Sequence, residues 1–498
     1  MALKDNLFSL VKSLAQGEKA FFVKSIPSNK NAELADYLIL FYAIDKMEEY
    51  DEDKLKLKLK KYAFVKHLPV VKNYLFNLIL KQLKTYHHES SVKNEVMELL
   101  QDAEILMKKA LYRESYKVLT KAEKIAEKYE FFTFSQDIYD RLLRLNYDLL
   151  AEKETNDYSL KIYEKQKMVF VKIAEIAELK FLRNTINDIL YSNENEAVKL
   201  QRKLELLKHR LLDADYKFKS YRAGVYYYHL RGRIFLQFND DEKRKEAYDA
   251  ALAFVAHLES DKDLLQTNLI NYAMALNNLI YIYHQLQFNQ YEESLEIINK
   301  LAGIKTEDQY LQYRIREKVI VNMLAYYLFT KKHKAGVVYI EQIEKEFLEN
   351  ELLYNSSFFL SAVDSMAMIY FLVGEYSKSL KWLNIVLNYK GSSRPDILYF
   401  GKILNLMIHY ELGNYDHLEY LFKPTETFLK KNNSFESYHK TMLNFFKKII
   451  HLTNKAEIKA GFRELSQSLA VIEKTDAEKI LFLLFNFREW ADRKASDV

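Results

Sequence analysis

The sequence predicts an all-α protein built from pairs of antiparallel helices, and three observations lead to this fold class. Among 498 residues only 10 are Gly and 4 are Pro, too few for the many turns of a sheet-rich architecture. Apolar residues make up 49% of the chain, which excludes a disordered protein. One pattern of small, aromatic and apolar residues also occurs twice at identical spacing. We therefore expect long helices joined by short connections.

The repeated pattern predicts a helical hairpin. Its two clearest copies are Ala103, Leu106, Ala110, Tyr112, Ser115, Leu119 and Ala122, and Ala367, Tyr370, Gly374, Tyr376, Ser379, Leu383 and Val386. The first two positions share one helix face, and the third ends that helix in a left-handed turn. An aromatic ring then fills the angle between the helices. The following Ser must be small because the two backbones approach each other there.

Weaker copies extend the array and set its period. If the close-approach residue is the anchor, Ser294, Gly336, Ser379 and Leu418 follow one another at steps of 42, 43 and 39 residues. In their order of residue types the units resemble the tetratricopeptide repeat family, over roughly residues 96–430. The period departs from that family's usual repeat of about 34 residues, so the helices or their connections are longer.

This resemblance implies a right-handed α-solenoid of stacked helix pairs, in which the first helices line a concave groove that binds a peptide or partner helix. The residues that would line it in two successive units are Asp364, Met368, Phe371, Ile403, Met407 and Tyr410. The other interpretation is that these side chains pack between units and leave no open groove.

The two ends lie outside the repeat, which divides the chain into an N-terminal helical cap (1–90), the repeats (91–430) and C-terminal capping helices (431–498). We expect N-terminal helices near 3–15, 17–25, 31–47, 53–62 and 69–87, with Asp53 as a cap. In the last helix, near 476–494, the run Ile480–Phe485 is too apolar to stay exposed. It closes the open end of the array, or alternatively forms a homodimer contact. Pro424 is expected to kink or stop its helix.

A basic segment in the cap suggests a second function. Lys56, Lys58, Lys60 and Lys61 alternate with apolar residues, which could indicate a strand, but helical patterns flank them. A short helix, a turn near His67–Pro69 and a further helix suggest a helix-turn-helix that binds nucleic acid. Against this, acidic residues from Glu48 to Asp53 can neutralise the lysines, and the following helix is apolar enough to be buried.

No motif indicates an enzyme, a cofactor or a metal site. The sequence has no GxGxxG, GxxxxGK[ST], HExxH or GxSxG, and no cysteine. His87, His88 and Glu89 are the one tight cluster with metal-capable side chains, and adjacent helical residues point in different directions. We expect a cytoplasmic protein without a membrane span.

Two hypotheses follow. The first is a non-enzymatic scaffold or adaptor that binds a protein or peptide on its concave face. The second is a regulator that joins a nucleic-acid-binding N-terminal segment to a repeat domain. The formal net charge of +5, from 74 basic and 69 acidic residues, is close to balance and favours the first.

Overall fold

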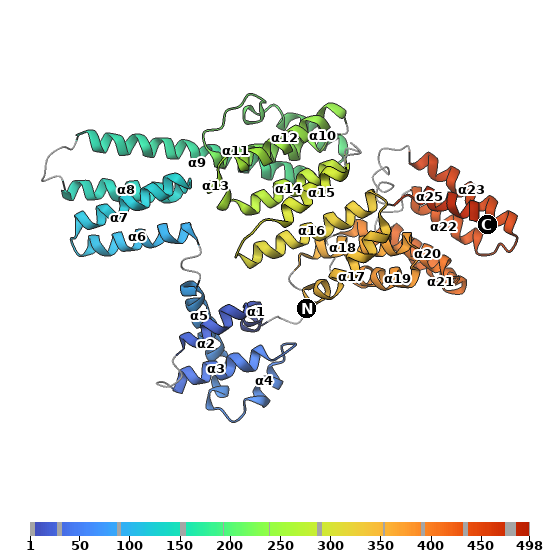
Figure 1. Ribbon diagram of the computed structural model, residues 1–498, viewed down its shortest axis with the longest axis horizontal. Coiled ribbons are helices and arrows are strands. Elements are labelled where there is room, and N and C mark those ends of the chain that lie inside the picture. The colour runs from blue at the N-terminus through green and yellow to red at the C-terminus, as the bar shows by residue number, and fades with distance from the viewer. Residues whose placement is uncertain are drawn as a thin grey trace. The chain divides into compact units, whose positions relative to one another are not determined.

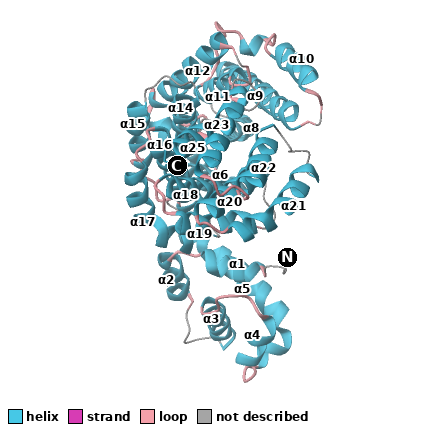
Figure 2. Cartoon of the chain, turned by 90° about the vertical axis from the view of Figure 1, so that its right-hand side faces the viewer, coloured by secondary structure: helices cyan, strands magenta, loops and turns pink. Residues whose placement is uncertain are grey.

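The structure is a computed structural model that describes residues 5–26, 32–86, 91–149, 156–192, 194–238, 240–285, 291–351, 354–389, 394–431, 437–473 and 485–497. All regular elements in these ranges are helices, as Figure 2 shows, and none of these residues lies in a strand. The predicted all-α class is therefore confirmed. The chain forms two compact units, Met1–Glu175 and Ile176–Val498, and the division falls within one long helix. It coincides with neither of the boundaries expected at residues 90 and 430.

The first unit begins with five α-helices and one 3₁₀ turn. Their bounds are α1 Asn6–Ser13, α2 Gln16–Ser25, α3 Ala32–Asp45, α4 Glu52–Lys58, η1 Ala63–His67 and α5 Leu68–Tyr86. The sequence predicted all five helices, and the strand alternative for the lysine segment is wrong. The cap of α4 is Asp51, whose side chain accepts the Lys54 N–H at 3.0 Å, and not Asp53. The predicted loop at Pro27 lies outside the described residues.

The rest of the first unit consists of α6 Val92–Lys108, α7 Tyr112–Lys128, α8 Phe132–Leu149 and the part of α9 Asn156–Tyr191 that precedes the division (Figure 1). Helix α6 packs on α7, and α7 packs on α8. These contacts confirm the predicted hairpin around Ala110.

The second unit continues the succession of helices. After the remainder of α9 come α10 Glu196–Leu206, η3 Arg210–Leu212, α11 Tyr221–Phe235, α12 Asp241–Glu259, α13 Lys262–Gln266, α14 Leu269–Gln285, α15 Tyr291–Ala302, α16 Gln309–Phe329, α17 His333–Glu349, α18 Ser356–Leu372, α19 Tyr376–Asn388, α20 Pro395–Glu411, α21 Tyr415–Lys431, α22 Ser437–Ile449, α23 Lys455–Ile472 and α25 Phe487–Asp497. Helices α14, α16, α18 and α20 contact one another in that order, and α15, α17, α19 and α21 each follow one of them. Helix α21 continues past Pro424 to Lys431, so of the two outcomes expected at this proline, a kink or a stop, the stop is wrong.

Residues in the left-handed conformation end several of the first helices. Ala110, Lys331, Gly374 and Gly413 have φ values of 58°, 55°, 84° and 70°. After Gly374 the Glu375 N–H donates to the Tyr370 carbonyl at 3.0 Å, and after Ala110 the Leu111 N–H donates to the Leu106 carbonyl at 3.0 Å. Such bonds satisfy carbonyl groups that a helix end leaves free. The turn positions predicted from the repeat are confirmed.

The close-approach serines also behave as predicted. The Ser115 hydroxyl donates to the Ala103 carbonyl at 2.9 Å, and the Ser379 hydroxyl donates to the Ala367 carbonyl at 2.7 Å. Both bonds are buried and span twelve residues. A larger side chain would push the two helices of the hairpin apart.

Candidate functional site

The six residues expected to line a concave groove do not form one. Five of them are buried, with exposed fractions of 7% for Asp364, 1% for Met368 and 0% for Phe371, Ile403 and Met407. Tyr410 is partly buried and packs against the same core. The second interpretation, packing between units, therefore describes these side chains, and none of the five buried ones offers a surface to a partner.

The chain's own C-terminal residues explain part of this burial. The rings of Phe371 and Phe485 lie 5.6 Å apart, and Trp490 lies 6.4 Å from Tyr410. The Trp490 indole N–H also donates to Glu411 at 2.7 Å. Phe485 and α25 thus cover the end of this core, as expected of the terminal apolar run. The residues Ile480–Leu484 of that run lie outside the described part.

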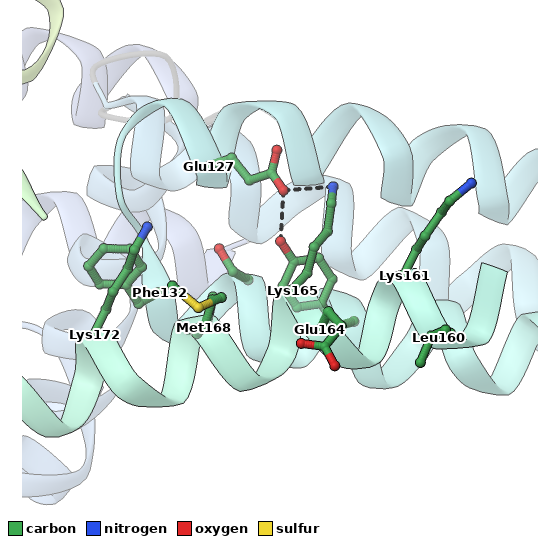
Figure 3. Close-up of a pocket in the computed structure, with 11 residues that line it drawn as sticks. Glu127, Phe132, Leu160, Lys161, Glu164, Lys165, Met168 and Lys172 are labelled. Carbon is green, nitrogen blue, oxygen red and sulfur yellow. Dashed lines mark hydrogen bonds and ion pairs between the residues drawn. The ribbon is translucent and has the colours of Figure 1, made fainter. Parts of the chain in front are cut away.

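An open hollow lies elsewhere, in the first unit, between the α7–α8 pair and the first half of α9 (Figure 3). Its volume is about 700 Å³. The residues that line it are Glu127, Phe132, Ser135, Tyr139, Leu160, Lys161, Glu164, Lys165, Met168, Val169 and Lys172.

The α7–α8 pair forms the wall opposite α9. The connection between these helices turns at Glu130, whose φ is 52°, and the Phe131 N–H donates to the Ala126 carbonyl at 2.8 Å. This sharp turn places the start of α8 beside the end of α7. Phe132 and Tyr139 are buried there, and Tyr139 donates its hydroxyl to Glu127 at 2.8 Å. Burial and this acceptor raise the pKa of Tyr139, which therefore stays protonated.

Long polar side chains connect α9 to that wall. Lys165 reaches Glu123 at 2.7 Å and Glu127 at 2.9 Å, and Figure 3 shows the second of these contacts. Gln166 donates to Asp140 at 2.6 Å. Burial lowers the pKa of Lys165, but the two carboxylates more than offset it, so the pKa lies above its ordinary value. These extended side chains connect α9 with the α7–α8 pair across the hollow.

The hollow combines apolar surface with a charged rim. Leu160 and Met168 on α9 are more than half exposed, although both are apolar. The Lys172 ammonium lies 5.3 Å from the centre of the Phe132 ring. Exposed apolar groups beside charged ones are typical of a surface that binds another molecule.

The hollow was not predicted from the sequence. A signal was nevertheless present. Lys161, Lys165 and Lys172 share one face of the helix, next to Leu160 and Met168, which is an amphipathic pattern without a covering partner.

The structure also places the His, Asp and Glu side chains of the described residues. No group of three or more His, Asp or Glu side chains among them could hold a metal ion, and His87, His88 and Glu89 lie outside the described ranges. Burial lowers the pKa of His284 and of His439 to about 4, so both are neutral packing residues. Within the same ranges, no helix is both long enough and apolar enough to cross a bilayer.

The structure places the basic segment on the surface. Lys56, Lys58, Lys60 and Lys61 are all exposed, on α4 and in the turn that follows it. Lys56 forms an ion pair with Glu52 at 2.7 Å.

In comparison with known proteins, no family model and no curated protein sequence matches the chain.

Proposed function

We propose that the chain is a non-enzymatic scaffold of helical hairpins that binds a segment of a partner protein in the hollow beneath α9. The hairpins would form the right-handed α-solenoid that the resemblance to tetratricopeptide repeats implies. The binding surface, however, is not the groove first expected from that resemblance, because its residues are core residues. The observation that carries the proposal is an accessible and largely apolar hollow between α9 and the α7–α8 pair, which the long side chains of Lys165 and Gln166 span.

The lining indicates the kind of segment that would bind. An apolar side chain would contact Leu160, Met168 and the edge of Phe132. A carboxylate beside it would pair with Lys172, whose ammonium lies over the Phe132 ring at the rim of the hollow. The fitting partner is therefore a short helix or peptide that places an acidic residue next to a large apolar one.

A peptide-display selection against the whole protein tests this function. We expect the selected peptides to pair an acidic with an apolar residue, and to bind Met168→Glu at least about tenfold more weakly, because that carboxylate would lie in the apolar hollow. The matched control is Tyr163→Glu, an exposed α9 residue that does not line the hollow. Peptides that bind wild type and Met168→Glu equally well would contradict the proposal, as would a selection that enriches nothing.

A further inference from the structure

The most uneven distribution of charge in the chain lies in the first unit. Residues 54–86 contain nine lysines and neither Asp nor Glu. In a protein whose total charge is close to balance, this is a local concentration of positive charge. It covers the last part of α4, the turn, η1 and all of α5.

Local acids neutralise only three of these lysines. Asp51 pairs with Lys54 at 3.3 Å, Glu52 pairs with Lys56 at 2.7 Å, and Lys72 contacts both Asp5 and Glu52. The neutralisation expected from Glu48 to Asp53 is thus incomplete. The other six are exposed and have no ion pair with an acid in the part of the chain that the structure describes: Lys58, Lys60, Lys61, Lys66, Lys81 and Lys84.

Helix α5 is not fully buried, contrary to the expectation from its apolar sequence. Its inner face, with Leu68, Leu75 and Ile79, packs against α1, α2 and α3. One outer face is exposed along the whole helix, and its side chains are Pro69, Val70, Asn73, Tyr74, Asn77, Leu80, Lys81 and Lys84. We call these residues, together with Lys58, Lys60, Lys61 and Lys66, the basic face.

We propose that the basic face binds double-stranded DNA, with the N-terminal half of α5 in the major groove. A major groove about 12 Å wide admits one helix. Lys60, Lys61 and Lys66 precede the N-terminus of α5, where they would contact phosphates on either side of the groove. Asn73 and Asn77 lie one turn apart on the exposed face, where the Asn77 amide donates to the Asn73 backbone carbonyl at 3.0 Å. An amide side chain pairs well with the edge of adenine, so Asn77 would exchange this bond for one to a base.

Other polyanions fit this face less well. A membrane-surface helix needs a continuous apolar stripe, whereas amides and lysines interrupt Val70, Tyr74 and Leu80. Single-stranded RNA is recognised by stacking on open aromatic rings. Tyr74 already stacks on Tyr37, with ring centres 5.8 Å apart and planes parallel within 1°.

Fluorescence anisotropy with the full chain and a random-sequence DNA duplex, over a range of salt concentrations, tests the proposal. Each lysine that neutralises a phosphate contributes about 0.9 to the slope of log affinity against log salt, so K60Q/K61Q/K66Q should reduce that slope by about 3. The matched control is K109Q/K117Q/K124Q, which removes the same charge from exposed positions on the α6–α7 hairpin. Circular dichroism verifies that both variants fold.

The position of α5 has its own test. N73A/N77A should keep the salt slope of wild type but lose the base preference that wild type shows in a selected pool of duplexes. If the pool shows no preference, or if N73A/N77A keeps it, α5 does not read the major groove.

No duplex binding at low salt would overturn the whole proposal. So would an equal reduction of affinity in the test and control triple variants, or tighter binding to phosphatidylserine vesicles or single-stranded RNA than to duplex.

Discussion

At the scale of single residues, Asp364 is the least expected group in the second unit. It lies in the interior of α18, and its Oδ1 atom has no hydrogen-bond partner among the described residues. Burial raises the pKa of this carboxyl group to about 8. In the unfolded chain its pKa would be about 3.9. The folded protein therefore holds a proton on Asp364 over a range of pH in which the unfolded chain releases it.

The contribution of Asp364 to stability should consequently fall as pH rises from about 4 to about 8, and should level off above that. Asp364→Asn removes the titrating group. The free energy of unfolding of this variant, relative to that of wild type, should therefore be greater at about pH 8 than at about pH 5. Urea unfolding at both pH values measures the difference. Asp249→Asn, at an exposed position on α12, is the control and should show no such trend. A constant difference between Asp364→Asn and wild type would contradict the prediction.

At the scale of elements, the hairpin turns are the part of the structure that the sequence determines most directly. A turn depends on a few adjacent residues, so Gly374 and Ala110 could be identified from the repeat alone. The left-handed backbone conformation has a different free-energy cost at the two positions. Ala110 adopts it with a Cβ atom, and Gly374 adopts it without one.

Exchanging the residue types should therefore have opposite effects. Ala110→Gly should raise the free energy of unfolding by up to about 1 kcal/mol, and Gly374→Ala should lower it by a similar amount. Thermal denaturation followed by circular dichroism measures both. Ala122→Gly, inside α7, is the control for glycine itself and should destabilise. If Ala110→Gly destabilises as Ala122→Gly does, the turn is not strained.

What the sequence did not predict depends on contacts between distant segments. Met368 and Phe371 resembled groove residues because the pattern shows a helix face but not what covers it. One of the rings that contact Phe371 belongs to Phe485, more than a hundred positions away. The hollow beneath α9 was not predicted either, because the repeat pattern specifies how the two helices of a hairpin pack and not how a third helix lies beside them.

At the scale of the whole molecule, burial is unevenly distributed among the helices. Eleven of the 17 residues of α18 are buried, whereas the 7-residue α4 has one buried residue, Leu55. Backbone amides exchange with solvent at rates that reflect local opening, which costs more where more apolar contacts must break.

Hydrogen exchange followed by mass spectrometry should therefore find α18 among the most protected segments and α4 among the least. Helix α20, whose interior is also largely buried, provides an internal comparison and should behave like α18. Equal exchange in α4 and α18 would show that the protein opens as one cooperative unit, which is contrary to our expectation.

The packing of Phe485 and Trp490 has a practical consequence for shortened proteins. Removing the C-terminal residues would expose Phe371, Phe400 and Tyr410 together, because all three contact these rings. A contiguous apolar surface of that kind promotes self-association. A truncated chain that captures many proteins would then bind them non-specifically through exposed core residues. A specific partner should therefore be sought with the full chain.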